Sequence, residues 1–216
     1  VHDARRSRLH AYDGREIAPA AASAGRFLKP DGTPMAFREA VATGIAVGVP
    51  GLVRMLGLAH AKHGRLAWAE LFASAIALAE GGFRVSPRLA TLIAADRQLK
   101  GDARASAYFH DAEGRPLAVG TLLRNPAYAA TLRKLSERGP RGLLEPPVAG
   151  EIVARTNAEP RPGTLTVADL AAYRPLENEA LCRPYRLYVV CVPPPPSSGV
   201  SLLQLLAILE RTDIAE

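Results

Sequence analysis

Four consecutive prolines occupy positions 193–196 and restrict how the last part of this chain can fold. The preceding residues 185–192 have the length and the β-branched content of a buried strand. Because proline fixes its backbone and lacks an N–H donor, the strand must stop and the prolines are expected to run as an extended segment. The following Ser-Ser-Gly can turn the chain into a helix over residues 202–216. A ligand for an SH3-type domain is the alternative, but this setting favours an internal connector.

A second constraint lies near the amino terminus, where Arg15 follows the end of a predicted strand. Two short strand-like runs joined by the polar residues 3–7 predict a hairpin, and Pro19 keeps its second strand from continuing into an ordinary ladder. A guanidinium fixed there can hold a carboxylate, because its planar fork presents paired N–H donors to two oxygens. Taken alone, the pattern favours a surface ion pair with Asp13 or Glu16, which contributes little stability.

The composition is that of a globular chain. Its 216 residues are 48% hydrophobic and 22% charged, which is enough material for one packed core or for two subdomains. No apolar run approaches the roughly 20 residues that span a bilayer, so no membrane span is expected. The net charge of +6 is distributed along the chain without a basic stripe or a recognition helix, so we do not expect nucleic-acid binding.

Between the strand-bearing ends, the pattern is helical. A helix is expected from Pro50 to Gly64, and the glycine-containing residues 43–51 before it fit close backbone packing, since they match neither a dinucleotide fingerprint nor a Walker loop. A second helix ends at Gly81-Gly82, and we expect its apolar stripe to be core. That stripe consists of Trp68, Leu71, Phe72, Ala75, Ile76 and Ala79.

Three later helical segments are also expected. A helix over residues 87–100 is predicted to bury Leu89, Leu92 and Ile93. Leu132 and Leu135 mark an amphipathic helix that stops at Gly139-Pro140, and Val148, Ile152 and Val153 mark a shorter one. Thr166 and Asp169 have the spacing of an amino-terminal cap, so the threonine is interpreted as a capping residue rather than a nucleophile.

No metal site or other cofactor site is expected. Cys182 and Cys191 are too few for a disulfide framework and lack metal-binding spacing with any histidine. We interpret them as strand residues and leave a bridge between them open. His60 and His63 lie at the end of a predicted helix, where cations interact well with the helix dipole, and no third ligand accompanies them.

In order along the chain, these local signals resemble the large-subunit region of γ-glutamyltranspeptidases. The matching segments are DGREIAPA (13–20), VGVPG (47–51), the AKHG turn to tryptophan (61–68), AIALAEGGFRV (75–85), TVADLAAY (166–173) and PPPSSG (194–199). Each motif is weak alone, but six in the right order cover nearly the whole chain.

The resemblance implies an α+β protein, part of the four-layer αββα fold of N-terminal-nucleophile hydrolases and mostly the helical large-subunit portion. Residues 1–216 would be a partial large-subunit domain, truncated at both ends. The nucleophile would be the new amino-terminal threonine of a small-subunit polypeptide made by self-cleavage, with its own amine as base. Arg15 would bind the α-carboxylate of a γ-glutamyl substrate such as glutathione. The resemblance also implies a periplasmic or extracellular location.

Departures from the family pattern keep other functions open. The chain has no Thr-Thr processing site and therefore no candidate catalytic residue of its own, so we expect it to be inactive alone. Val200 stands where the family usually has a second glycine. A related acylase that cleaves cephalosporin side chains is the nearest alternative, and a noncatalytic scaffold that binds a partner is the other.

Overall fold

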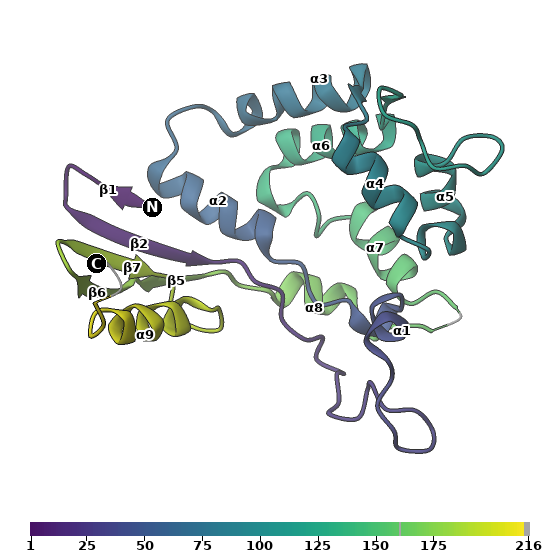
Figure 1. Cartoon of the computed structure of the whole chain (residues 1–216). Helices are drawn as coiled ribbons and strands as arrows, with labels where there is room; N and C mark the ends of the chain where they lie inside the picture. Colours follow the sequence, from purple (N-terminus) through teal and green to yellow (C-terminus); the bar gives the residue numbers. More distant parts are fainter. Residues whose placement is uncertain (160, 214–216) are drawn as a thin grey trace.

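The computed structural model describes residues 1–159 and 161–213, with strands near both ends of the chain and helices between them (Figure 1). The α-helices are α1 (Phe37–Val41), α2 (Leu52–His63), α3 (Ala73–Gly81), α4 (Pro87–Ala95), α5 (Ala103–Phe109), α6 (Pro126–Arg138), α7 (Val148–Thr156), α8 (Val167–Ala172) and α9 (Gly199–Leu209). Short 3₁₀ helices are η1 (Gly44–Ala46), η2 (Trp68–Phe72), η3 (Leu99–Gly101) and η4 (Gly139–Arg141).

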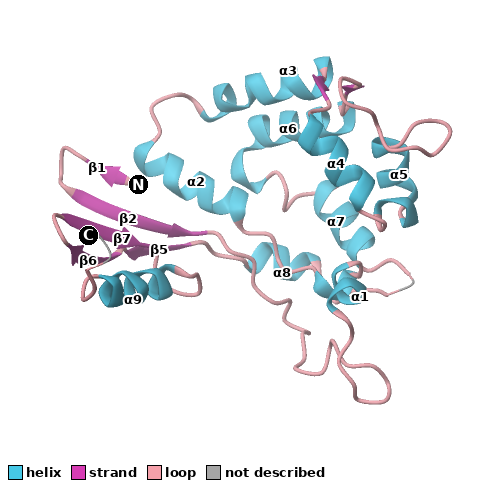
Figure 2. Cartoon of the chain, in the orientation of Figure 1, coloured by secondary structure: helices cyan, strands magenta, loops and turns pink. Residues whose placement is uncertain are grey.

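The strands form antiparallel pairs (Figure 2). A three-stranded sheet has the order β1 (His2–Asp3), β2 (Arg8–Asp13) and β5 (Leu176–Glu179). The other pairs are β3 (Phe83–Arg84) with β4 (Leu122–Leu123) and β6 (Leu181–Tyr185) with β7 (Tyr188–Val192). In Figure 1, α2 lies on one side of β2, and α9 lies beside the β6–β7 hairpin. The expected α+β class is confirmed.

Several helices begin where polar caps precede them. The Asn125 side chain accepts a hydrogen bond from the Tyr128 backbone N–H at 2.9 Å, directly before a proline that starts α6. At α8, Thr166 and Asp169 form a reciprocal capping box, as the sequence predicts. These caps satisfy backbone donors that have no partner inside the helix, so the local sequence fixes where the helices begin.

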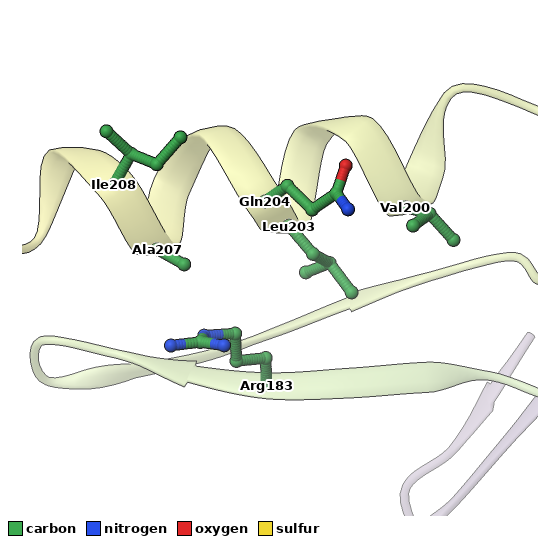
Figure 3. Close-up of a pocket in the computed structure, with 6 residues that line it drawn as sticks. All are labelled: Arg183, Val200, Leu203, Gln204, Ala207 and Ile208. Carbon is green, nitrogen blue, oxygen red and sulfur yellow. The ribbon is translucent and has the colours of Figure 1, made fainter.

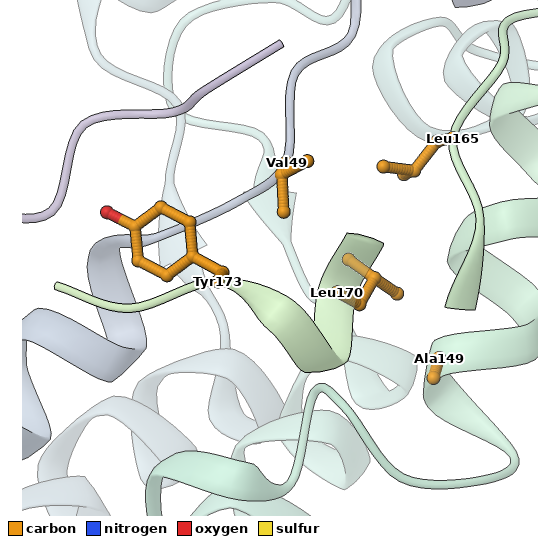
Figure 4. Close-up of a cluster of buried hydrophobic side chains, with 5 residues drawn as sticks. All are labelled: Val49, Ala149, Leu165, Leu170 and Tyr173. Atoms are coloured by element: carbon orange, nitrogen blue, oxygen red, sulfur yellow. The ribbon is translucent and has the colours of Figure 1, made fainter. Parts of the chain in front are cut away.

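One cluster of buried apolar side chains lies around α8 (Figure 4). It contains Val49, Ala149, Leu165, Leu170 and Tyr173, which come from the segment before α2, from α7 and from α8 with its flanks. Leu144, Ile152 and Val153 pack against it. The core therefore joins the segment that leads into α2 to the later helices.

Close backbone approach occurs in the glycine-containing segment, as expected. A Cβ atom added to Gly44 would overlap the carbonyl oxygen of Thr156. One added to Gly51 would overlap the Tyr173 ring and lie 2.6 Å from the carbonyl oxygen of Gly14. A side chain at either position would force fixed backbone apart, which explains the glycines there.

The expected burial of two helices is only partly correct. Trp68 and Phe72 are half-buried against α6, and the Trp68 indole N–H donates to the Leu135 carbonyl at 2.9 Å. Leu71 is 49% exposed and Leu92 is 53% exposed, so neither belongs to the core. Within the described part of the chain, α6 covers only one side of α3. The apolar stripe predicted for residues 68–79 is therefore wider than the face that α6 buries.

The prediction of one continuous strand over residues 185–192 is wrong. The structure begins β6 at Leu181 and turns at Arg186 and Leu187, so the predicted strand is split by a hairpin. Arg186 takes a left-handed φ of 51°, which is usually a role for glycine or asparagine and gave no turn signal in the sequence. Tyr188 and Val189 are mostly exposed rather than buried.

The carboxyl-terminal part follows the expected order of connector and helix. Pro193 and Pro194 lie outside any regular element, and Pro195 and Pro196 form a turn toward α9. The helix itself is shorter than predicted, and positions 214–216 of that prediction lie outside the described residues. Of the helices that are described, none has both the length and the apolar character needed to cross a bilayer.

Candidate functional site

Arg15 lies just after the end of β2, as the sequence predicts. Its backbone N–H donates to the Asp13 side chain at 2.8 Å, so this carboxylate binds the backbone at the strand exit. The guanidinium is 54% exposed, and its Nε lies 3.8 Å from Glu16 Oε1. A contact that long on an exposed side chain holds the guanidinium weakly and leaves its donors available to a ligand.

The backbone at Arg15 is held more firmly than its side chain. The Tyr173 hydroxyl donates to the Arg15 carbonyl oxygen at 2.9 Å, and this tyrosine is only 3% exposed. Burial, with the negative charges of Asp13 and Glu16, raises the pKa of Tyr173, so its hydroxyl remains a donor at neutral pH. On the other side, Gly14 lies directly against Met55 of α2.

The segment after Arg15 is anchored in the same way. Ile17 bridges to the buried Val49 through a backbone hydrogen bond of 2.8 Å. The Ala20 N–H donates to Asp169 Oδ1 at 2.9 Å, while Asp169 Oδ2 accepts from both the backbone and the hydroxyl of Thr166. The hydrogen bond from Ala20, followed by those from Thr166, lowers the pKa of Asp169.

We expect Asp169→Asn to lower the stability of the full-length protein in a pH-dependent way. The folded-state pKa of Asp169 lies below its ordinary value of 3.8, so the charged form contributes stability above that pH and loses it as the pH falls through the folded pKa. Urea unfolding midpoints should therefore differ at neutral pH and converge in acid. The exposed Glu137→Gln is the control and should show no difference. A gap of the same size at every pH would contradict this role of the charge.

A cavity of about 150 Å³ lies beside Arg15. It brings together the exit of β2 and the proline run, which are about 180 positions apart in the sequence. Its lining residues are Ala11, Tyr12, Asp13, Arg15, Asn178, Pro193, Pro194, Pro196 and Ser197. The polar lining thus consists of one guanidinium, the Asp13 carboxylate, two hydroxyls and one amide. The carboxylate already accepts the Arg15 backbone N–H, and the guanidinium, hydroxyls and amide supply the donors for an anionic group.

Only the side of this cavity that Arg15 contributes was predicted from the sequence. The prolines were interpreted as a connector, and neither Asn178 nor Ser197 was singled out as a site residue. Ser197 was interpreted as part of a turn into the last helix, and no local pattern indicates that a segment near position 195 lies beside position 15.

A larger hollow of about 480 Å³ lies between α9 and β6 (Figure 3). Arg183 reaches from β6 toward the helix, while Leu203 points from α9 toward the hairpin. The remaining lining residues are Val200, Gln204, Ala207 and Ile208. This lining contains no carboxylate, thiol, imidazole or hydroxyl, so the cavity beside Arg15 is the better candidate for a functional site.

A polar network links the sheet to the end of α2. Glu177 of β5 pairs with Lys62, and its Oε1 lies 3.1 Å from His10 Nδ1 and 3.4 Å from the Tyr12 hydroxyl. The Tyr12 hydroxyl in turn lies 2.7 Å from His63 Nε2. The hydrogen bond from Lys62 is the largest cause of a lowered pKa at Glu177. Sequence reasoning missed this network, because it connects residues from three distant segments.

His60 and the two cysteines make structural contacts. His60 Nε2 lies 2.9 Å from the Leu66 carbonyl oxygen. Across the described ranges, no three metal-ligating side chains of histidine, cysteine, aspartate or glutamate gather in one place. Cys182 and Cys191 face each other across the β6–β7 hairpin and form a disulfide, which the sequence had left open.

Comparison with known proteins decides the family. A family model described as gamma-glutamyltranspeptidase matches residues 1–216, the whole of this chain. The chain belongs to the γ-glutamyltranspeptidase family. The resemblance inferred from six short motifs is therefore confirmed.

Individual members of the γ-glutamyltranspeptidase family agree with this assignment. The chain is 34% identical over 212 residues to human glutathione hydrolase 7, covering 97% of this chain and 30% of that protein. It is 33% identical over 207 residues to the Escherichia coli glutathione hydrolase proenzyme, covering 94% of this chain and 35% of that protein. The chain thus spans about a third of these curated relatives.

A solved member of the family shares the fold. The crystal structure of Helicobacter pylori γ-glutamyltranspeptidase superposes with a TM-score of 0.91 at 28% identity, covering 100% of this chain and 61% of that one. The architecture is therefore part of an N-terminal-nucleophile hydrolase fold, as expected from the resemblance.

Proposed function

We propose that residues 1–216 form part of the large subunit of an enzyme that hydrolyses or transfers the γ-glutamyl group of amides such as glutathione. The names of the human and bacterial relatives, glutathione hydrolases, support this substrate class. The observation that carries the proposal is Arg15, whose guanidinium lines a small polar cavity while its backbone is fixed by Tyr173.

In this proposal, Arg15 binds the α-carboxylate of the glutamyl group. Two N–H donors of the guanidinium would meet the two carboxylate oxygens, which sets both the position and the orientation of the substrate. Ser197 and Asn178 line the same cavity and can offer further hydrogen bonds. Because the carboxylate end is fixed, the γ-amide at the other end of the substrate reaches toward the nucleophile.

The nucleophile in this proposal is a threonine on a small-subunit polypeptide outside residues 1–216. Its hydroxyl oxygen would form a bond to the γ-carbonyl carbon, and the hydroxyl proton would pass through the threonine's own amine to the departing nitrogen as the C–N bond breaks. Water or an acceptor amine would then attack the acyl-enzyme and release the threonine hydroxyl. Residues 1–216 would bind and orient the substrate, and would be inactive without the partner polypeptide.

The remaining parts of the proposal concern domain and location. Residues 1–216 would be one partial large-subunit domain rather than a complete enzyme. The location would be periplasmic or extracellular, and the Cys182–Cys191 disulfide supports an oxidising compartment.

We expect the complete, self-cleaved protein to release p-nitroaniline from γ-glutamyl-p-nitroanilide. The matched comparison is a cephalosporin carrying an acyl side chain, which tests the acylase alternative, and a noncatalytic scaffold would process neither compound. Absorbance of the released aniline measures the reaction, and a gel confirms that both subunits are present. Cleaved protein that releases no aniline would overturn the proposal.

A further inference from the structure

The segment that carries Arg15 is held at both ends by α8. Tyr173, directly after the last residue of this six-residue helix, donates its hydroxyl hydrogen to the Arg15 carbonyl oxygen at 2.9 Å. Asp169, in the first turn of the same helix, accepts the Ala20 N–H at 2.9 Å. One short helix thus fixes two points of the loop that follows β2.

We propose that Tyr173 is a positioning residue for Arg15, and that its hydroxyl fixes the peptide from which the guanidinium reaches into the substrate cavity. This inference rests on the proposed function, because it states how the same site keeps its carboxylate-binding group in place.

The Tyr173 ring has little freedom to move. It belongs to the buried core with Leu165 and Leu170 (Figure 4). It also lies so close to Gly51 that a Cβ added to this glycine would overlap the ring. The position of the hydroxyl is therefore set by the core of the protein rather than by the loop. A hydrogen bond from such a fixed donor can hold the Arg15 peptide in one place.

The Arg15 side chain has no comparable support of its own. It is half exposed, and its described ion pair is the 3.8 Å contact to Glu16. The position and direction of the guanidinium therefore depend on where the Arg15 backbone is held. Holding that backbone in advance reduces the conformational entropy lost when a carboxylate binds, so the hydroxyl affects substrate affinity without touching the substrate.

The test is Tyr173→Phe in the full-length, self-cleaved protein, which keeps the ring and removes only the hydroxyl. With γ-glutamyl-p-nitroanilide, we expect KM to rise about two- to tenfold, the range for one neutral hydrogen bond, with little change in kcat. With γ-aminobutyryl-p-nitroanilide, which lacks the α-carboxylate, KM should not change. The control is Tyr128→Phe, because Tyr128 is exposed on α6.

Combining the substitution with Arg15→Ala separates positioning from a general structural effect. Without the guanidinium, removing the hydroxyl should not raise KM further, so the two effects should not add. Equal increases of KM in both backgrounds, or for both substrates, would overturn the positioning role. If Tyr173→Phe does not fold, Asp169→Ala removes the acceptor of the Ala20 N–H and so releases the other end of the segment. It is expected to give the same pattern of KM changes, and its failure to do so would overturn the role.

The same data distinguish the two proposals. An unchanged KM in Arg15→Ala would overturn the proposed function itself. A raised KM in Arg15→Ala together with an unchanged KM in Tyr173→Phe would overturn only the positioning role of the tyrosine.

Discussion

Replacing Arg15 by alanine in the full-length protein is expected to raise KM for γ-glutamyl-p-nitroanilide about 10- to 100-fold, with a much smaller effect on kcat. The substitution removes charge-assisted hydrogen bonds to the substrate carboxylate, and each such bond contributes about 1.5–3 kcal/mol. Because the Arg15 side chain is half exposed, we expect the increase of KM to lie in the lower part of the range of about 10- to 100-fold. Self-cleavage should continue, since no step of it uses the substrate carboxylate. Steady-state kinetics of the cleaved protein measure the effect.

Two further variants make this result specific to the guanidinium. Arg15→Lys should recover little of the lost affinity, because a lysine ammonium keeps the charge but not the planar pair of donors. Arg88→Ala removes an exposed arginine from the first turn of α4 and should leave KM unchanged. An unaltered KM in Arg15→Ala, or full recovery by lysine, would contradict carboxylate binding by this residue.

Gly51→Ala is expected to destabilise the protein by about 2–3 kcal/mol, a large effect for one methyl group. The new Cβ would overlap the Tyr173 ring and approach the Gly14 carbonyl oxygen to 2.6 Å. The ring is buried in the core and the carbonyl belongs to the backbone beside Arg15, so neither can move cheaply. The midpoint of urea unfolding measures the loss.

Gly150→Ala is the matched control for this prediction. Gly150 is exposed within α7, and nothing lies within 4 Å of the position that its Cβ would take. Alanine there should stabilise the helix by about 0.5–1 kcal/mol, because it has less backbone freedom to lose on folding. Similar effects from both substitutions would show that the close approach at Gly51 is not what makes that position sensitive.

Features determined by nearby residues could be predicted from the sequence. The end of α6 follows from Gly139-Pro140, and the start of α8 follows from Thr166 and Asp169. Arg15 at the exit of β2 also follows from local pattern, because two short strand-like runs joined by a polar loop predict the hairpin and Pro19 limits its extension. In each case, the interactions that decide the structure lie within a few residues.

Burial could not be predicted in the same way. Periodicity identifies an apolar stripe, but it does not show how much surface will cover it, so Leu71 and Leu92 were assigned wrongly to the core. The β6–β7 hairpin was missed because Arg186 adopts a conformation that its side chain does not favour.

The candidate site was predictable only where its parts are local. Arg15 was identified because strand, glycine and proline signals surround it. Its partners Tyr173 and Ser197 lie far away in the sequence, and their proximity depends on how α8 and the proline run pack against β2. The network around Glu177 was missed for the same reason, since it joins three distant segments.

The central claim is that Arg15 recognises the α-carboxylate of a glutamyl substrate. The most direct measurement compares kcat/KM for γ-glutamyl-p-nitroanilide with that for γ-aminobutyryl-p-nitroanilide, in the full-length enzyme and in Arg15→Ala. We predict that the full-length protein strongly prefers the substrate with the carboxylate and that Arg15→Ala loses about 10- to 100-fold of this preference. An equal preference in both proteins would contradict it.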